Sequence, residues 1–504
     1  MSESRAGSWL IRYKHWLFFA FFASLFGLLF LLRTGVWNKK PTQVPASALS
    51  SPGEFRGGNT WMNIIQDDRK IGFSHTRYTK TATGYQFTET VLMKINTMGL
   101  IQDVGLTTQG RLNLDFSVAA FSFEMSSGRF SFSADGSISD RMLSLTIDNG
   151  TDKQKTEIKL FDKIYFPSGI LQAAAFEDLT PGRRLSVKVF DPLSMGQEPI
   201  QLTVFEKETI RIMGEVRSAT KVSLKYKGAT QLAWIDDQGG ILKEQGMLGL
   251  TLEKTTQKDA LYEFPDQPGR DLTRIASIPS NVAIADSKAL SSLRVELSGV
   301  QALTLSLNGG RQSYQAPVLT IVKEQIPPAT HRRQIDDSNI IRFLQPGPLV
   351  QSDHPRIQKL AHEITGKADN DLEKIRLLMD WIKDHIQKRP VLSIPNALAI
   401  LENRMGDCNE HAVLFAALAR ASGIPTRIEA GVVYLKHRFY YHAWNAVYLD
   451  GWVTLDALFY QFPADVTHIR LADGDPKDQL DILGLIGKLN IHIRDDKHSD
   501  DSAQ

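Results

Sequence analysis

The sequence predicts an α+β protein with an N-terminal transmembrane helix, a large antiparallel β region and a C-terminal domain in which helices precede strands. Three observations support this fold class. Residues 16–32 form an uncharged apolar stretch, hydrophobic residues then alternate with polar ones as far as residue 264, and after Pro355 the hydrophobic period becomes that of a helix. A length of 504 residues allows about three folding units.

The composition excludes several classes of protein. Lys and Arg together number 58 against 56 Asp and Glu, a net charge of +2, and no basic run supplies the concentrated positive face typical of nucleic-acid binding. The only cysteine is Cys408, so the chain has neither an intramolecular disulfide nor a cysteine-based zinc cluster. Its thiol is therefore either a small buried apolar group or a nucleophile.

Residues 1–40 are predicted to be a short leader and a membrane anchor, with the span at residues 16–32. This stretch is at the short end of what crosses the ~30 Å hydrocarbon layer, and Trp16 and Trp37 are typical interfacial anchors. A buried core helix and a cleaved signal peptide are the alternatives, but the nearest small-residue cleavage motif, at residues 46–48, lies too far downstream.

Basic residues are equally numerous before and after the predicted span, so their count does not decide the orientation of the anchor. The short leader decides it instead. A short leader favours a single-pass topology with a cytoplasmic N-terminus. The bulk of the chain would then be extracytoplasmic, in the periplasm or at the cell surface.

Residues 41–58, rich in Pro, Ser, Gly and Ala, are predicted to be a linker. Residues 59–264 carry alternating patterns such as Leu112, Leu114 and Phe116, separated by turn residues, and predict an extracytoplasmic antiparallel β domain. It contains no catalytic constellation, so its aromatic residues are interpreted as core. A ligand or an envelope partner for this region remains an alternative.

Residues 274–325 show a few more strands, which form either a small β module or an extension of the first domain. Residues 350–494 combine two helices with later strands and are predicted to be the catalytic domain. Residues 495–504 are polar and are expected to form a loose tail.

Within the C-terminal domain, the pattern predicts a helix capped by Asn370 or Asp371 and a second helix from near Asp407 to Gly423. Strands are expected to follow, and their predicted ranges are residues 428–435, 441–449 and 452–455.

The start of the second helix carries the candidate chemistry. A helix N-terminus offers unpaired N–H groups and partial positive charge, which we expect to lower the pKa of the Cys408 thiol. A thiol nucleophile also needs a base and a group that orients the base. His442 and Asp456, on two successive strands, are the candidates.

The length of the hairpin loop decides whether this pair can meet. A two-residue loop at Asp450 and Gly451 would place His442 and Asp456 on opposite faces of the sheet. A three-residue loop, with Gly451 in the left-handed conformation, brings them to one face as diagonal neighbours. We therefore predict a loop of odd length.

The segments GDCNEHAVLFAALARASGIPTR and YHAWNAVYLDGWVTLDAL resemble the bacterial branch of the transglutaminase-like superfamily, here as a membrane-anchored member. The resemblance covers about residues 350–473. It implies a papain-like transglutaminase core with Cys408 as nucleophile, His442 as general base and Asp456 as the orienting acid. It implies no cofactor.

The predicted function is a thiol enzyme that acts on peptide or isopeptide amides through an acyl-thioester. A peptidase or amidase is favoured, and a cross-linking acyltransferase is an alternative. The alternatives are a non-catalytic envelope scaffold and a main function in the β region. His411 is an alternative base, and Trp444 could contact substrate or belong to the core. A partial calcium-loop pattern at residues 473–484 lacks the required Gly and Glu, so no metal is predicted.

Overall fold

The computed structural model describes residues 58–498 except for residues 129, 149–152, 167–168, 172–178, 192–195, 263–267, 301–304, 329–335, 393–395 and 475–481. Strands make up 51% of the described residues and helices 20%. The α+β assignment is therefore wrong, and the described chain is mostly β. Strand content exceeds helix content because the β region forms one very large sheet. The described helices longer than five residues lie only between residues 355 and 421.

The transmembrane helix predicted at residues 16–32 lies outside the described residues. Among the helices that the structure describes, none combines the length and the apolar character needed to cross a membrane.

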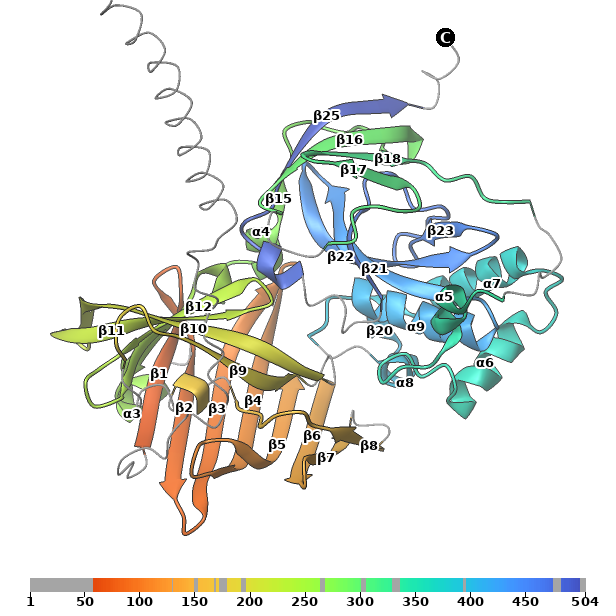
Figure 1. The fold of residues 1–504 in the computed structure, drawn as a ribbon. Helices are drawn as coiled ribbons and strands as arrows, with labels where there is room; N and C mark the ends of the chain where they lie inside the picture. Colours follow the sequence, from red (N-terminus) through yellow and green to blue (C-terminus); the bar gives the residue numbers. More distant parts are fainter. Residues whose placement is uncertain are drawn as a thin grey trace, which may run out of the picture.

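A single antiparallel sheet of 14 strands occupies residues 58–255, in the order β8-β7-β6-β5-β4-β3-β2-β1-β14-β13-β12-β11-β10-β9 (Figure 1). The first and last strands, β1 and β14, are paired at its centre, and β8 and β9 form its edges. The strands are β1 (Gly58–Gln66), β2 (Arg69–Lys80), β3 (Gly84–Thr97), β4 (Leu100–Asn113), β5 (Val118–Ser127), β6 (Phe130–Ser139), β7 (Met142–Asp148), β8 (Lys153–Lys159), β9 (Arg184–Asp191), β10 (Gly196–Ile212), β11 (Glu215–Tyr226), β12 (Ala229–Ile235), β13 (Ile241–Gln245) and β14 (Leu250–Thr255).

Alternation places one face of each strand in the core, as the sequence predicts. In β7, Leu143 and Leu145 are buried whereas Met142 and Ser144 are exposed. Apolar side chains of the two halves of the sheet form separate clusters, one around Phe87 and Leu143 and the other around Val222.

Short helices α3 (Gln257–Leu261) and α4 (Leu272–Ala276) lead to a four-stranded sheet, ordered β17-β18-β16-β25. Its strands are β16 (Leu290–Ser298), β17 (Gln312–Gln315), β18 (Val318–Val322) and β25 (Asn490–His498). The segment predicted as a small β module thus pairs with the last strand of the chain. That strand continues past Asp495, where a loose tail was expected, because it pairs with β16 as far as His498.

The remaining sheet carries the predicted catalytic strands, in the order β15-β22-β21-β24, with β23 paired to β22. Its strands are β15 (Ile278–Pro279), β21 (Thr426–Leu435), β22 (Arg438–Tyr448), β23 (Trp452–Leu455) and β24 (Ile469–Gly474). The associated helices and short strands are α5 (Ser338–Ile341), α6 (Pro355–Thr365), α7 (Asp371–His385), β19 (Gln387–Lys388), α8 (Ala397–Asn403), β20 (Met405–Gly406) and α9 (Cys408–Ala421). Both predicted helices are confirmed, and Asn370 caps α7.

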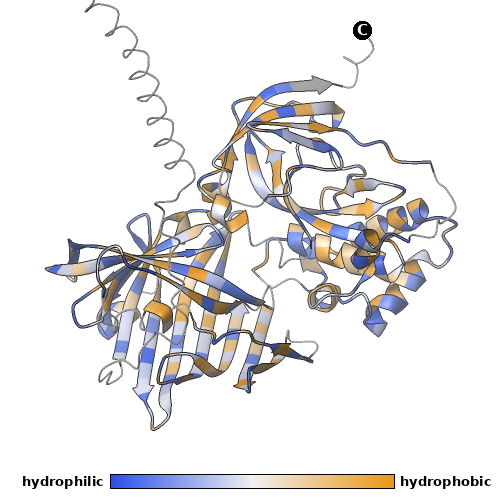
Figure 2. Cartoon of the chain, in the orientation of Figure 1, coloured by the Kyte–Doolittle hydropathy of each residue, from blue (hydrophilic) through white to orange (hydrophobic). Residues whose placement is uncertain are grey.

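Helix α9 is central to this domain, with 12 of its 14 residues buried. Figure 2 shows it as largely hydrophobic, whereas α6 and α7 each present a hydrophilic face. Its apolar residues pack against α6, α7 and α8 and against Ala443 and Val447 of β22. A second core joins β16, β18 and β25 to Val432, Phe439 and Ile469. The catalytic sheet is therefore held by helices and by the four-stranded sheet.

We expect Ile493→Ala to lower the free energy of unfolding by about 2–5 kcal/mol, because its side chain is 4% exposed within this second core. The midpoint of denaturant unfolding would measure the change. His492→Ala, an exposed neighbour on the other face of β25, is the control and should have little effect. Equal midpoints for both variants would show that β25 is not part of this core.

Candidate functional site

Cys408 is the first residue of α9, at a helix start fixed by a capping box. The Asp407 carboxylate accepts a hydrogen bond from the backbone N–H of Asn409 at 3.0 Å, and the Glu410 carboxylate accepts one from the N–H of Asp407 at 2.9 Å. This reciprocal capping stabilises the first turn of a helix. The capping residues Asp407 and Glu410 therefore fix the position of the Cys408 thiol in the first turn of α9.

The hairpin between β22 and β23 has the predicted odd length. Tyr448 pairs with Trp452, which leaves a three-residue loop of Leu449, Asp450 and Gly451. The left-handed residue is Asp450, with φ 58°, rather than Gly451 as expected. Aspartate tolerates this conformation better than most residues, so the correction changes the turn but not the register.

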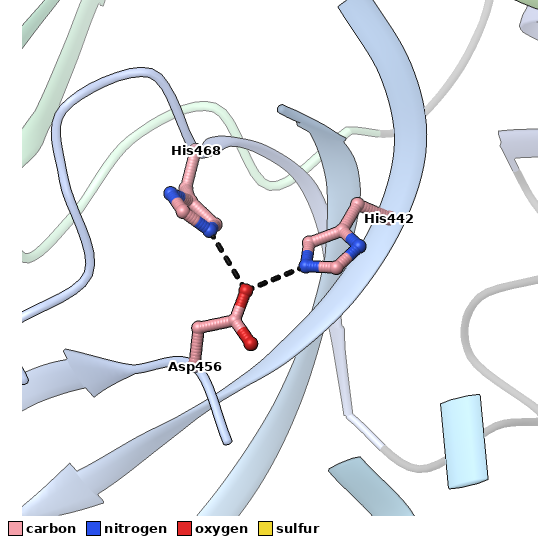
Figure 3. A group of neighbouring side chains, drawn as sticks. All are labelled: His442, Asp456 and His468. Atoms are coloured by element: carbon pink, nitrogen blue, oxygen red, sulfur yellow. Dashed lines mark hydrogen bonds and ion pairs between the residues drawn. The ribbon is translucent and has the colours of Figure 1, made fainter. Parts of the chain in front are cut away.

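This register brings His442 and Asp456 together. The Nε2 atom of His442 donates a hydrogen bond of 2.6 Å to Oδ2 of Asp456, which is 1% exposed (Figure 3). Oδ1 of the same carboxylate accepts the backbone N–H of Phe459 at 2.8 Å. Burial alone would raise the pKa of Asp456, but its hydrogen bonds and the charges of His442 and His468 hold that pKa well below its usual range.

His468 is a third member of this group that the sequence analysis missed. Its Nε2 lies 3.0 Å from Oδ2 of Asp456 (Figure 3). Its Nδ1 lies 3.3 Å from Oδ1 of Asp465, and the side chain is fully buried. Burial lowers its pKa, but the two carboxylates outweigh burial and raise the pKa to about 9. The only signal in the sequence is a polar pair, Thr467 and His468, between the apolar residues Val466 and Ile469.

The thiol of Cys408 lies beside the histidine strand. Its sulfur is hydrogen-bonded by the backbone of Ala443, the residue after His442, and the side chain is 9% exposed. Burial and the charges of Asp407, Glu410 and Asp456 raise the pKa of the thiol well above its usual value. The expected lowering of the thiol pKa by the helix N-terminus is therefore outweighed, first by burial and then by the two capping carboxylates.

Aromatic rings flank His442. Phe459 stacks on its imidazole with centroids 4.8 Å apart, and Trp444 lies 6.1 Å away on the same strand. Trp444 is 1% exposed and its indole N–H donates to Glu429 at 2.9 Å, so this conformation does not support the predicted substrate contact. His411, the alternative base, is also buried, with Nδ1 2.7 Å from the carbonyl oxygen of Asp407.

His442, Asp456 and His468 also have donor atoms within 4.8 Å of one another, close enough to hold a metal ion. Both Nε2 atoms are already bonded to Oδ2 of Asp456. The hydrogen-bond network therefore accounts for this grouping by itself.

A sequence profile of the transglutaminase-like superfamily matches residues 358–457, which contain Cys408, His442 and Asp456. These residues form a transglutaminase-like domain. No curated protein matches the chain.

Several solved structures are similar to parts of the chain. A candidate cysteine protease from Cytophaga hutchinsonii is 22% identical, over 40% of this chain and 81% of its own, with a TM-score of 0.27. The periplasmic domain of TgpA from Pseudomonas aeruginosa is 17% identical, over 36% of this chain and 86% of its own, with a TM-score of 0.24. A β-barrel-like protein from Brucella abortus is 7% identical, over 39% of this chain and 94% of its own, with a TM-score of 0.31. These scores are low, and the superfamily assignment rests on the sequence match.

We expect Asp407→Asn to lower the pKa of the Cys408 thiol, because it removes a nearby negative charge while asparagine keeps the helix cap. The rate of iodoacetamide alkylation against pH measures this directly, since the chain has no other cysteine. Asp369→Asn, at an exposed carboxylate before α7, is the control. An unchanged or higher midpoint in Asp407→Asn would contradict the assigned cause.

Proposed function

We propose that the chain is a thiol enzyme that cleaves peptide or isopeptide amide bonds, with Cys408, His442 and Asp456 as its catalytic residues. The observation that carries this proposal is the 2.6 Å hydrogen bond from His442 Nε2 to the buried Asp456 carboxylate. It occurs on the strand whose next residue, Ala443, hydrogen-bonds the Cys408 sulfur. Nucleophile, base and orienting acid are thus supplied by one helix start and one hairpin.

The hydrogen bonds indicate which nitrogen of His442 reacts. Asp456 is ionised and can only accept, so Nε2 carries a proton, and the lone pair of the neutral ring is then on Nδ1. Among the described residues, Nδ1 has no hydrogen-bond partner. We assign to it the proton that leaves the Cys408 thiol.

The first half-reaction forms an acyl-enzyme. As the sulfur of Cys408 attacks the amide carbonyl, its proton passes to Nδ1 of His442, and the backbone N–H of Cys408 at the start of α9 stabilises the oxyanion. The carbon–nitrogen bond then breaks, and the departing amine takes the proton from Nδ1. Because the thiol pKa is raised, we expect proton transfer to accompany the attack rather than precede it.

The second half-reaction decides between hydrolysis and cross-linking. Water attacks the thioester with His442 as base, giving a carboxylic acid and the free thiol; a primary amine would give a new amide instead. We favour water, as the resemblance to bacterial members of the superfamily implies. Incubation of a glutamine-containing peptide with and without a tagged primary amine tests this choice, and incorporation of the tag would overturn the hydrolase assignment.

We expect His442→Ala to lower kcat/KM for peptide cleavage by about 10²–10⁴, because it removes the group that accepts and returns the proton. Cys408→Ala should remove activity and all alkylation by thiol reagents. His362→Ala, at an exposed histidine on α6, is the matched control and should leave cleavage unchanged. Full cleavage activity in His442→Ala would refute the mechanism.

A further inference from the structure

We propose that His468 is a positioning residue for the reaction at Cys408, a buried imidazolium that fixes the Asp456 carboxylate and offsets its negative charge at the catalytic pair. This inference rests on the proposed function. His468 does not touch the reacting atoms; it acts through Asp456, whose Oδ2 it shares with His442 (Figure 3).

The contacts of the ring indicate its protonation. Nε2 of His468 faces the Asp456 carboxylate at 3.0 Å, and Nδ1 faces Oδ1 and the carbonyl oxygen of Asp465 at 3.3 Å and 3.2 Å. All of these partners are acceptors, because both carboxylates are ionised. A neutral imidazole could donate from only one nitrogen, so the ring satisfies both sides only as a cation.

The second carboxylate of this arrangement is itself held in place. Oδ1 of Asp465 accepts from the backbone N–H of Thr467 at 2.9 Å and from its hydroxyl at 2.6 Å. Oδ2 accepts from the hydroxyl of Ser287 at 2.8 Å and from the Gln461 amide at 3.1 Å. A chain of contacts therefore runs from Ser287 through Asp465, His468 and Asp456 to His442.

Other charged groups around His468 do not replace its charge. Arg311 donates to its backbone carbonyl at 2.8 Å and is paired with Glu324 at 3.3 Å. Arg470, two residues along β24, is bonded to Glu429 at 3.1 Å. Both guanidinium groups are thus paired with carboxylates other than Asp456, whereas His468 lies directly against Asp456.

The expected consequence is a shift in pH dependence. The rings of His442 and His468 have centroids 5.6 Å apart. Loss of one positive charge beside Asp456 makes the site more negative, and we expect this to raise the pKa of the Cys408 thiol.

The test is His468→Gln in the full chain, since glutamine keeps one donor and removes the charge. We expect the midpoint of Cys408 alkylation to move up by about one to two pH units, and cleavage at pH 7 to fall about tenfold with partial recovery at higher pH. His362→Ala is again the control. An activity loss at all pH values without a shift of the midpoint would show a merely structural role and overturn the proposal.

A measurement on the unaltered protein does not depend on the folding of a variant. In the ¹⁵N NMR spectrum of histidine-labelled protein, assigned with His468→Gln or by contact with Phe459, we expect both ring nitrogens of His468 to be protonated at pH 7 and to titrate near pH 9. A neutral ring at pH 7 would overturn the proposal. An imidazolium together with a shifted alkylation midpoint, but without amide cleavage by the wild type, would instead count against the proposed function alone.

Discussion

The buried carboxylate of Asp456 is the group on which the arrangement of the site depends. An ionised carboxylate removed from water is stable only when hydrogen bonds and opposite charge compensate for its lost hydration. Asp456 receives donors from His442, His468 and the backbone of Phe459. These donors come from different segments of the chain. The contacts that compensate for the buried charge of Asp456 therefore also hold the strands of the site together.

A second buried carboxylate, Glu429 of β21, is stabilised in the same way on the other side of β22. Burial opposes ionisation of Glu429, but the guanidinium groups of Arg427, Arg470 and Arg311 hold its pKa at about 2. The remaining oxygen of Glu429 accepts the indole N–H of Trp444, two residues after His442. Two side chains on the same face of β22 are thus each held by a buried carboxylate, His442 by Asp456 and Trp444 by Glu429. Trp444 therefore contributes to the core of the site.

The parts of the site that could be predicted are those that depend on local rules. Loop length alone determines which residues of the hairpin share a face, so the proximity of His442 and Asp456 followed from counting residues. Residue types at the helix start predicted that the second helix begins near Asp407, which is its N-cap residue. The raised pKa of Cys408 depends on burial and on the sum of several charges, and neither can be read from spacing.

Long-range pairings were the part of the fold that the sequence did not reveal. His468 lies outside any motif, and its role depends on Asp465 and Ser287 lying nearby. Likewise, no local pattern indicates that β25 joins β16 almost two hundred residues earlier. Strand patterns predicted the β region correctly but not that one sheet would contain 14 strands, which is why the overall class was misjudged.

The pairing of β25 with β16 limits how the chain can be divided into smaller folded fragments. A fragment cut to the superfamily match at residues 358–457 would lose β16, β18, β24 and β25, together with Ser287, Asp465 and His468. It would expose apolar surface that these strands cover and leave Asp456 without one of its two imidazole partners. The smallest autonomous unit containing the thiol should therefore reach from β15 to His498, and shorter expression fragments risk aggregation along uncovered strand edges.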